Sequence, residues 1–383
     1  MPLADTLKKK GLTSLNSHPL WKGPMTDGVT QSMLSNYLVC KERFRIGVIE
    51  GLGPFDRFNK GLEYGQMWHL CEEMYAAGQD WKEPLKTYCR ELCKRFKESQ
   101  EEIDKWYRVC LVQFPVYLDY WKKHPDVKSR ENLLPEVSFK IPYRLPDMRT
   151  VYLRGKWDSV DLIGKGKQKK IYLQENKTKG EIDEEQLRRI LGSGFELQTM
   201  LYLTALSSEG AREAHPELEN FKVAGVRYNV IRRPLSGGKG SIRQKKGSKN
   251  IRPETTEEFY ARLRDDYIAK EPEYFFMRWK VEVSKKDLER FQGEVLNPLL
   301  MEVADNYEWW DYCNEENEST FNTKLRAEVF PDHSTYHYRY PYGIYNPIDK
   351  RGEGDLDHYV NTGSNVGLER KKTLFPELEE EQL

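Results

Sequence analysis

The sequence predicts an α/β protein in which a central mixed β-sheet is flanked by helices and preceded by a helical region. Apolar residues recur at three- and four-residue spacing through the first third of the chain, which is typical of amphipathic helices. β-branched and aromatic runs begin after residue 130 and are typical of strands. The expected order of strand, strand, strand, helix, strand indicates a mixed sheet with a helix crossing one face.

The helical periodicity covers residues 31–47, 60–75 and 81–121, and Pro115 and Pro125 are expected to mark the end of the last stretch. Strands are expected at residues 135–143, 150–163, 170–177 and 221–231, with a helix over residues 184–206 before the last of them.

A further helix is expected to begin after an N-cap at Thr255 or Thr256, followed by a strand at residues 274–284 and a helix over 285–312. These elements suggest four parts. They are a helical region over residues 1–130, a core over 131–235, a basic loop over 236–252 and a closing region over 253–383.

Composition excludes several classes of protein. The 61 basic and 61 acidic side chains cancel, so a polyanionic partner must be held by a local basic patch. No apolar run approaches the roughly 20 residues of a membrane span, and the first residues lack the apolar stretch of a signal peptide. The six cysteines form no disulfide framework, which agrees with a reducing compartment. We expect a soluble intracellular protein without membrane contacts.

Charged residues interrupt two expected strands. Glu175 and Lys177 are two residues apart, so their side chains share one strand face and Asn176 points away. A hairpin through the sequence GKGKQ would bring Asp158 beside Glu175. Two carboxylates this close are stable when a cation lies between them or one is protonated. Hard oxygen ligands favour Mg²⁺ or Mn²⁺, and an adjacent ammonium stabilises negative charge, so the pattern indicates phosphodiester hydrolysis.

Four short motifs carry a family resemblance. They are GQMWH at residues 65–69, GKWDSVD at 155–161, ENKT at 175–178 and QTMLY at 198–202. Together they resemble the motifs of the PD-(D/E)XK nuclease superfamily, and within it the RecB-like branch that includes phage and CRISPR-associated exonucleases. The resemblance implies a restriction-endonuclease-like core and a metal-dependent DNA nuclease, more often an exonuclease than a site-specific endonuclease.

The resemblance also implies a role for individual residues. The implied catalytic residues are Asp158, Glu175, Lys177, Gln198 and Tyr202. The implied ligands of Mg²⁺ or Mn²⁺ are His69, Asp158, Glu175 and the backbone carbonyl of Asn176. Gln198 and Tyr202 are four residues apart on one helix face, so both can reach the site or the DNA backbone. Glu136, at the start of the first expected strand, would assist a metal or orient the lysine.

Each of these residues also has an ordinary structural explanation. Asp158 can belong to an exposed strand edge, and Glu175 with Lys177 can be an ordinary ion pair on one strand face. His69 can be a core or surface histidine, and Gln198 and Tyr202 can be helix-surface residues. Asp161 is expected to be structural, because three residues after Asp158 it points to the other side of the strand. Cys89 and Cys93 have no second cysteine pair nearby, so we expect thiols that are buried or half-buried.

Residues 232–252 contain eight Lys or Arg and no acid, so they form either a solvated insertion or a DNA contact. We expect a mobile loop whose charges lie beside the metal centre, where a DNA backbone passes. The tyrosine-rich segment at residues 328–355 either stacks on single-stranded bases or packs. The candidate DNA-binding residues are Arg232, Arg233, Lys239, Arg243, Lys245, Lys246 and Lys249.

Cys40 resembles the first cysteine of the iron–sulfur cluster found in several RecB-like nucleases. The corresponding late segment, residues 330–349, contains no cysteine, and Cys313 stands alone. His333 and His337 would still leave the set short of four ligands. We therefore expect no cluster, with Cys40 a packed thiol.

The sequence thus predicts a Mg²⁺- or Mn²⁺-dependent deoxyribonuclease of DNA recombination, repair or phage DNA metabolism, in contact with other recombination or replication proteins. The expected location is the cytoplasm, or the host cytoplasm if the chain is phage-encoded. The alternative is an inactive nuclease-fold subunit that binds DNA or joins an assembly. Joint retention of Asp158, Glu175 and Lys177 favours the enzyme, and a carboxylate-pair glycosidase leaves Lys177 without a use.

Overall fold

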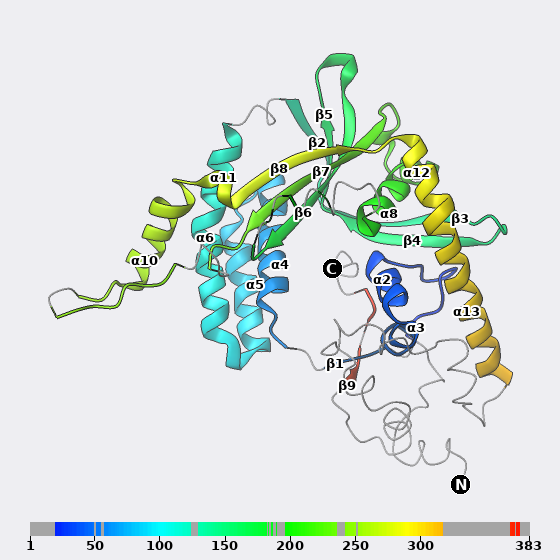
Figure 1. Ribbon diagram of the computed structural model, residues 1–383, viewed down its shortest axis with the longest axis horizontal. Coiled ribbons are helices and arrows are strands. Elements are labelled where there is room, and N and C mark those ends of the chain that lie inside the picture. The colour runs from blue at the N-terminus through cyan, green and yellow to red at the C-terminus, as the bar shows by residue number, and fades with distance from the viewer. Residues whose placement is uncertain are drawn as a thin grey trace, which may run out of the picture. The chain divides into compact units, whose positions relative to one another are not determined.

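The computed structural model describes residues 20–49, 51–54, 57–123, 129–181, 196–235, 242–249, 252–316, 368–371 and 373–375, together with a few positions between 182 and 195 (Figure 1). The chain forms two compact units, each assembled from stretches that are separate in sequence. Unit 1 comprises Met1–Asp56, Ser138–Lys156 and Glu289–Leu383, and unit 2 comprises Arg57–Val137 and Trp157–Leu288.

Unit 1 contains two small sheets and several helices. Strand β1 (Leu52–Pro54) pairs with β9 (Leu368–Arg370), and β3 (Val137–Arg144) pairs with β4 (Thr150–Trp157). The helices are α2 (Gln31–Val39), α3 (Lys41–Phe44), η1 (Arg45–Ile49), η8 (Gln292–Leu296) and α13 (Asn297–Glu316), and α12 (Lys285–Phe291) leads into them. Trp21 is fully buried and meets the rings of Phe44 and Tyr307 at 5.3 and 5.0 Å, so aromatic edges form much of this core.

Unit 2 is built on a five-stranded mixed sheet in the order β2-β5-β6-β7-β8. Only the β6–β7 pair is parallel, and helices α8 (Leu197–Leu206) and α9 (Glu209–Ala214) lie in the connection between these two strands. The predicted fold class is therefore confirmed: a mixed central sheet with flanking helices. The strands are β2 (Arg130–Leu134), β5 (Ser159–Ile163), β6 (Lys170–Lys179), β7 (Val223–Arg232) and β8 (Phe276–Glu282).

Helices α4 (Lys60–Ala76), α5 (Lys82–Arg95) and α6 (Gln100–Lys122) form the helical part of unit 2 (Figure 1). Their shared core is rich in aromatic side chains such as Trp68, Trp106 and Phe114, all almost fully buried. This core also includes residues of α10 (Thr256–Arg262), η7 (Leu263–Ile268) and α11 (Pro272–Phe275). Short 3₁₀ turns are found at η2 (Lys97–Ser99), η4 (Gly166–Gln168) and η5 (Pro216–Leu218).

Several sequence expectations about these elements have a clear outcome. Thr255 is the N-cap of α10, and Glu258 completes a capping box with it. Pro115 does not end its helix: it lies inside α6, which continues to Lys122 because burial of its apolar face outweighs the loss of one hydrogen bond. The single strand expected at residues 150–163 is two strands, β4 and β5, separated at Asp158. Most of the segment before α8 and all of the tyrosine-rich segment lie outside the described residues.

Gly225 in β7 is held in a conformation and a space that exclude a side chain. Its φ is +150°, and a Cβ atom there would lie 2.0 Å from the carbonyl oxygen of Val281 on β8. We expect Gly225→Ala to lower the free energy of unfolding by about 2 kcal/mol or more, measured by urea denaturation. Gly293→Ala is the control, because no atom lies within 4 Å of that Cβ position. Equal stability of the two variants would contradict this account of β7.

Candidate active site

The candidate site forms where β6 extends past the end of β5. The first residue of β5, Ser159, pairs with Gln174, so among the described strands residues 175–179 of β6 pair only with β7. Asp158 precedes β5, and its Oδ2 accepts a hydrogen bond of 2.7 Å from the backbone N–H of Asn176. The carboxylate thus takes the place of a missing strand partner. Because Ser159 pairs with Gln174, the preceding residue, Asp158, lies beside the next residue of β6, Glu175.

This arrangement places the backbone carbonyl of Asn176 at the same open edge. The N–H and C=O groups of one strand residue point to the same side of the strand. Because the Asn176 N–H meets Asp158, its carbonyl oxygen also faces the side that β5 has left. The sequence-predicted carbonyl ligand is therefore brought to the same edge as Asp158.

Glu175, Lys177 and Gln198 form a closed triangle of hydrogen bonds. Lys177 Nζ donates to Glu175 Oε2 at 2.9 Å and to Gln198 Oε1 at 2.8 Å, and Gln198 Nε2 donates to the same Glu175 oxygen at 3.1 Å. Gln198 comes from the first turn of α8, which covers this face of the sheet through a hydrogen bond of 2.7 Å between Thr199 and Tyr228. The lysine ammonium is therefore held by side chains from both β6 and α8.

Burial controls the charges of this triangle. Glu175 is fully buried, and its burial raises the pKa of the carboxyl to about 7; Lys177 opposes this rise and Asp158 adds to it. Burial lowers the pKa of Lys177, but Glu175 and Asp158 outweigh it and the net shift is upward. Lys177 is therefore an ammonium at neutral pH. A permanent positive charge suits stabilisation of an anionic transition state and not proton abstraction.

His69 reaches the open edge from α4. Gly65, one turn earlier, faces β6, and a Cβ atom there would be in van der Waals contact with Thr178 Oγ1 at 3.4 Å. His69 Nδ1 lies 3.6 Å from Asp158 Oδ1. Burial lowers the pKa of His69, but Asp158 and Glu136 outweigh it and the net shift is upward. Glu136, between β2 and β3, is therefore electrostatically part of the same surroundings.

The remaining site candidates divide into two groups. Tyr202 follows Gln198 by one helical turn on the partly exposed face of α8, as predicted from their spacing. Asp161 is completely buried, and its Oδ2 accepts hydrogen bonds from Arg130 Nε at 2.7 Å and Arg227 at 2.9 Å. Its Oδ1 accepts from Ser159 at 2.8 Å. Asp161 therefore lies in a structural ion-pair network, in agreement with the sequence expectation.

The donors at the open edge fit a hard divalent cation in their chemistry. Glu175 Oε1 is buried and has no hydrogen-bond partner, while its Oε2 accepts two bonds. An unpartnered buried carboxylate oxygen beside a second carboxylate favours a cation between them. In the described part of the chain, however, no three His, Cys, Asp or Glu side chains are already grouped as a metal site. The residues therefore fit a divalent cation by their types of donor atom and by their position at the same edge of β6.

Sequence reasoning missed the polar residues on the opposite face of the sheet. Gln174 and Asn176 on β6 pair in register with Arg227 and Asn229 on β7, and all four are buried. Asn229 Nδ2 donates to Asn176 Oδ1 at 2.8 Å and to Tyr117 of α6 at 2.8 Å. The available signal was polar residues spaced two apart within strands that otherwise read as core.

The basic segment is placed differently from the sequence expectation. Residues 242–249 lie beyond α10, on the side of α6 away from α4 in Figure 1, so they do not lie beside the candidate site. The backbone N–H of Lys245 donates to Glu254 at 2.8 Å, and Arg262 donates to the Arg243 carbonyl at 3.0 Å, so this part is tethered. Arg243, Lys245, Lys246 and Lys249 have exposed side chains, and Lys239 lies outside the described residues.

Arg232 and Arg233 are packed at the end of β7. Arg232 is 5% exposed, and its guanidinium lies 4.1 Å from the ring centre of Tyr274, which points to packing in place of the expected DNA contact. The N–H of Arg233 donates to the Lys179 carbonyl at 2.8 Å. Burial also lowers the pKa of Arg233.

The cysteines described here are thiols. Cys40 and Cys89 are buried and Cys93 is half-buried. Cys71 and Cys110 face each other with their sulfurs 3.7 Å apart. The late segment that would complete an iron–sulfur cluster lies outside the described residues, as does the side chain of Cys313.

Comparison with known proteins identifies the class to which this fold and site belong. The family model of the PD-(D/E)XK nuclease superfamily matches residues 29–297, and the chain belongs to this superfamily. No curated protein matches the sequence. No helix among the described residues is long and apolar enough to cross a membrane.

Asp161 and Asp158 provide a test of the two different roles within one short segment. Asp161→Ala leaves Arg130 and the fully buried Arg227 without their carboxylate, so we expect it to lower the free energy of unfolding by about 3–5 kcal/mol. Asp158→Asn keeps an acceptor for the Asn176 N–H and removes a charge near Glu175, so it is expected to stay near wild-type stability. Urea denaturation measures both; an equally stable Asp161→Ala would remove the structural role.

Proposed function

We propose that this protein is a metal-dependent deoxyribonuclease that hydrolyses phosphodiester bonds at the open edge of β6. The observation that supports it best is the hydrogen-bonded triangle of Glu175, Lys177 and Gln198 beside Asp158, in which the buried Glu175 keeps one oxygen without a partner. A salt bridge with only a structural role would not require a second carboxylate, Asp158, beside the buried Glu175, whose pKa is raised.

In this proposal His69, Asp158, Glu175 and the Asn176 carbonyl hold Mg²⁺ or Mn²⁺. When bound, such an ion supplies Lewis-acid polarisation of a phosphate oxygen and lowers the pKa of a water molecule. Lys177, kept protonated by the two carboxylates, stabilises the negative charge that grows on the phosphate during attack. Gln198 holds the Lys177 ammonium and the Glu175 carboxylate in position through its two hydrogen bonds. Tyr202 contacts the DNA backbone one turn further along α8.

The resemblance to RecB-like nucleases supports an exonuclease and a setting in DNA recombination, repair or phage DNA metabolism, together with other proteins of those processes. Labelled linear and covalently closed circular DNA, each with and without Mg²⁺, test the proposal. Degradation of the linear DNA alone, dependent on metal, is the expected result. Linear DNA that is bound but never cut in Mg²⁺ or Mn²⁺ would instead identify an inactive DNA-binding subunit.

Lys177→Ala separates catalysis from binding. We expect kcat on linear DNA to fall by about a hundredfold or more, because the transition state loses its positively charged donor. Binding of DNA should stay close to wild type, since the lysine is not a proposed metal ligand. Lys169→Ala, which replaces a partly exposed lysine that directly precedes β6 and pairs with Glu131, should keep full activity. Full activity of Lys177→Ala would disprove the assignment of this site.

Glu175→Ala should act on the metal as well as on the rate. Mg²⁺ or Mn²⁺ is expected to raise the unfolding temperature of the wild-type protein by preferential binding to the folded state. The variant removes the unpartnered buried carboxylate oxygen, so it should lose both this thermal shift and cleavage. Lys177→Ala should keep the shift. A Glu175→Ala protein with an unchanged metal-dependent shift would place the ion elsewhere.

The exposed basic segment remains a proposed DNA contact, now at a distance from the cleavage position. Changing Arg243, Lys245, Lys246 and Lys249 to Gln should weaken DNA binding and flatten its dependence on salt, by about 0.9 in log–log slope for each phosphate that the variant no longer neutralises. The same change at Lys86 and Lys94, exposed lysines of α5, is the control. An unchanged slope would return the segment to an ordinary solvated insertion.

A further inference from the structure

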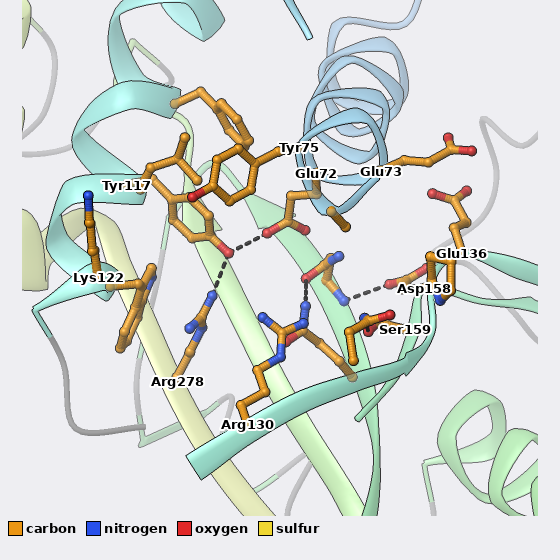
Figure 2. A pocket seen from close by; sticks show the side chains of 18 residues that line it. Glu72, Glu73, Tyr75, Tyr117, Lys122, Arg130, Glu136, Asp158, Ser159 and Arg278 are labelled. Carbon is orange, nitrogen blue, oxygen red and sulfur yellow. Dashed lines mark hydrogen bonds between the residues drawn. The ribbon is translucent and has the colours of Figure 1, made fainter. Parts of the chain in front are cut away.

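A pocket of about 470 Å³ lies on the face of β6 opposite Glu175 and Lys177 (Figure 2). Its floor is formed by the buried side chains of Ser159, Gln174 and Asn176, and its walls come from α4, α6 and β8. Asp158 and Glu136 line one end, so the pocket and the candidate active site share this edge. The volume is within the range of roughly 300–1,000 Å³ that is typical of small-molecule sites.

The charges of the pocket are separated in space. Figure 2 shows Asp158, Glu136 and Glu73 toward one end, and Arg278 and Lys122 toward the other. Neither Arg278 nor Lys122 forms an ion pair with any carboxylate in the described part of the chain. Arg130, between the two ends, shares the single carboxylate of Asp161 with Arg227, so this group also carries excess positive charge. Glu72 also lines the pocket and accepts a hydrogen bond from Tyr117, so a carboxylate lies near the cationic end, but among the described residues none contacts Arg278 or Lys122 directly.

Aromatic rings form the wall beside the cationic end. The Arg278 guanidinium lies 4.1 Å from the ring centre of Trp121, and it donates a hydrogen bond of 2.6 Å to Tyr117. Tyr117 in turn donates to Glu72, so its ring is fixed before any ligand arrives. Tyr75 stands at the mouth and is 53% exposed, although it is a large ring next to a buried core.

We propose that this pocket binds one unpaired nucleotide of the DNA strand next to the bond that is cleaved. The base stacks on the exposed Tyr75 ring, and a phosphate is held by Arg278 and Lys122. The proposal rests on the proposed function, because it places the scissile phosphodiester at Asp158, at the opposite end of the pocket.

Three features favour a nucleotide over other ligands. An aromatic surface and the Arg278 guanidinium, which donates hydrogen bonds to Tyr117 and Asn229 but forms no ion pair among the described residues, together suit a base and its phosphate. This combination is typical of sites for single-stranded nucleic acid. On the floor, the oxygens of Gln174 and Asn176 already accept hydrogen bonds from Arg227 and Asn229, so the polar groups offered to a base or sugar are the amide N–H groups of these two side chains. The pocket admits one nucleotide but no base pair, so the strand must be unpaired at this position.

Binding of deoxyadenosine 5′-monophosphate to the full-length protein in EDTA tests the proposal, with calorimetry as the measurement. Deoxyadenosine and inorganic phosphate are the comparison ligands, and each should bind at least about tenfold more weakly because it fills only one end of the pocket. Tyr75→Leu and Arg278→Gln should each weaken binding of the nucleotide about tenfold. Tyr75 is exposed, so its replacement leaves the fold intact even if Arg278→Gln does not.

Matched controls are available in the same unit. Tyr267→Leu replaces another exposed tyrosine, and Arg264→Gln replaces an arginine at the surface; neither residue lines the pocket, and both variants should bind like wild type. On linear DNA, Tyr75→Leu should raise KM with little change in kcat.

The outcomes separate this proposal from the proposed function. The experiment in EDTA needs no cleavage, so nucleotide binding that disappears in both variants supports the pocket even if DNA is never cut. A protein that cleaves linear DNA but binds the nucleotide equally well in wild type, Tyr75→Leu and Arg278→Gln, or not at all at millimolar concentration, would overturn the pocket and leave the nuclease intact.

Discussion

The late start of β5 is the constraint on which the candidate site depends. Because β5 begins at Ser159, opposite Gln174, the following residues of β6 keep backbone groups that need partners on that side. Asp158 meets one of these needs by accepting the Asn176 N–H, and this hydrogen bond fixes a carboxylate beside the buried Glu175. A β5 longer by two residues would satisfy the edge with backbone alone, and no carboxylate would then be held there.

The two aspartates of the sequence DSVD show how differently one segment treats its charges. Asp161 accepts hydrogen bonds from two arginines, a serine and an asparagine, so its burial is fully compensated. Asp158 lies near Glu175, whose burial raises its pKa to about 7 and which keeps one oxygen without a partner. The unfavourable electrostatic interactions are thus concentrated where the buried Glu175 lies beside Asp158. A buried charge without full compensation is typical of a functional position.

Side chains alternate between the two faces of β6, so one face carries the candidate catalytic residues and the other face lines the pocket. Glu175 and Lys177 point toward α8, where Gln198 holds them, whereas Gln174 and Asn176 point toward α4 and α6 and form the floor of a pocket. Asp158, at the end of the strand pair, borders both faces. The pocket and the proposed reaction site at Glu175 and Lys177 therefore meet at Asp158, its neighbour Glu136 and Asn176.

The sequence by itself determined the fold class, an N-cap at Thr255 or Thr256, and the approach of Asp158 to Glu175 and Lys177, because periodicity, capping and hairpin spacing are local properties of the chain. Gln198 was assigned to the same site by the family resemblance. Tertiary structure alone decided that the expected strand at 150–163 breaks at Asp158. The part before Asp158 pairs with β3 and the part after it pairs with β6, and pairing with β6 depends on contacts between segments, not on local sequence. It also decided the place of the basic segment, which Glu254 and Arg262 tether to α10. The pocket wall of Tyr75, Tyr117, Trp121 and Arg278 unites three elements up to 203 residues apart. No local pattern can reveal such a wall, because packing between distant segments creates it.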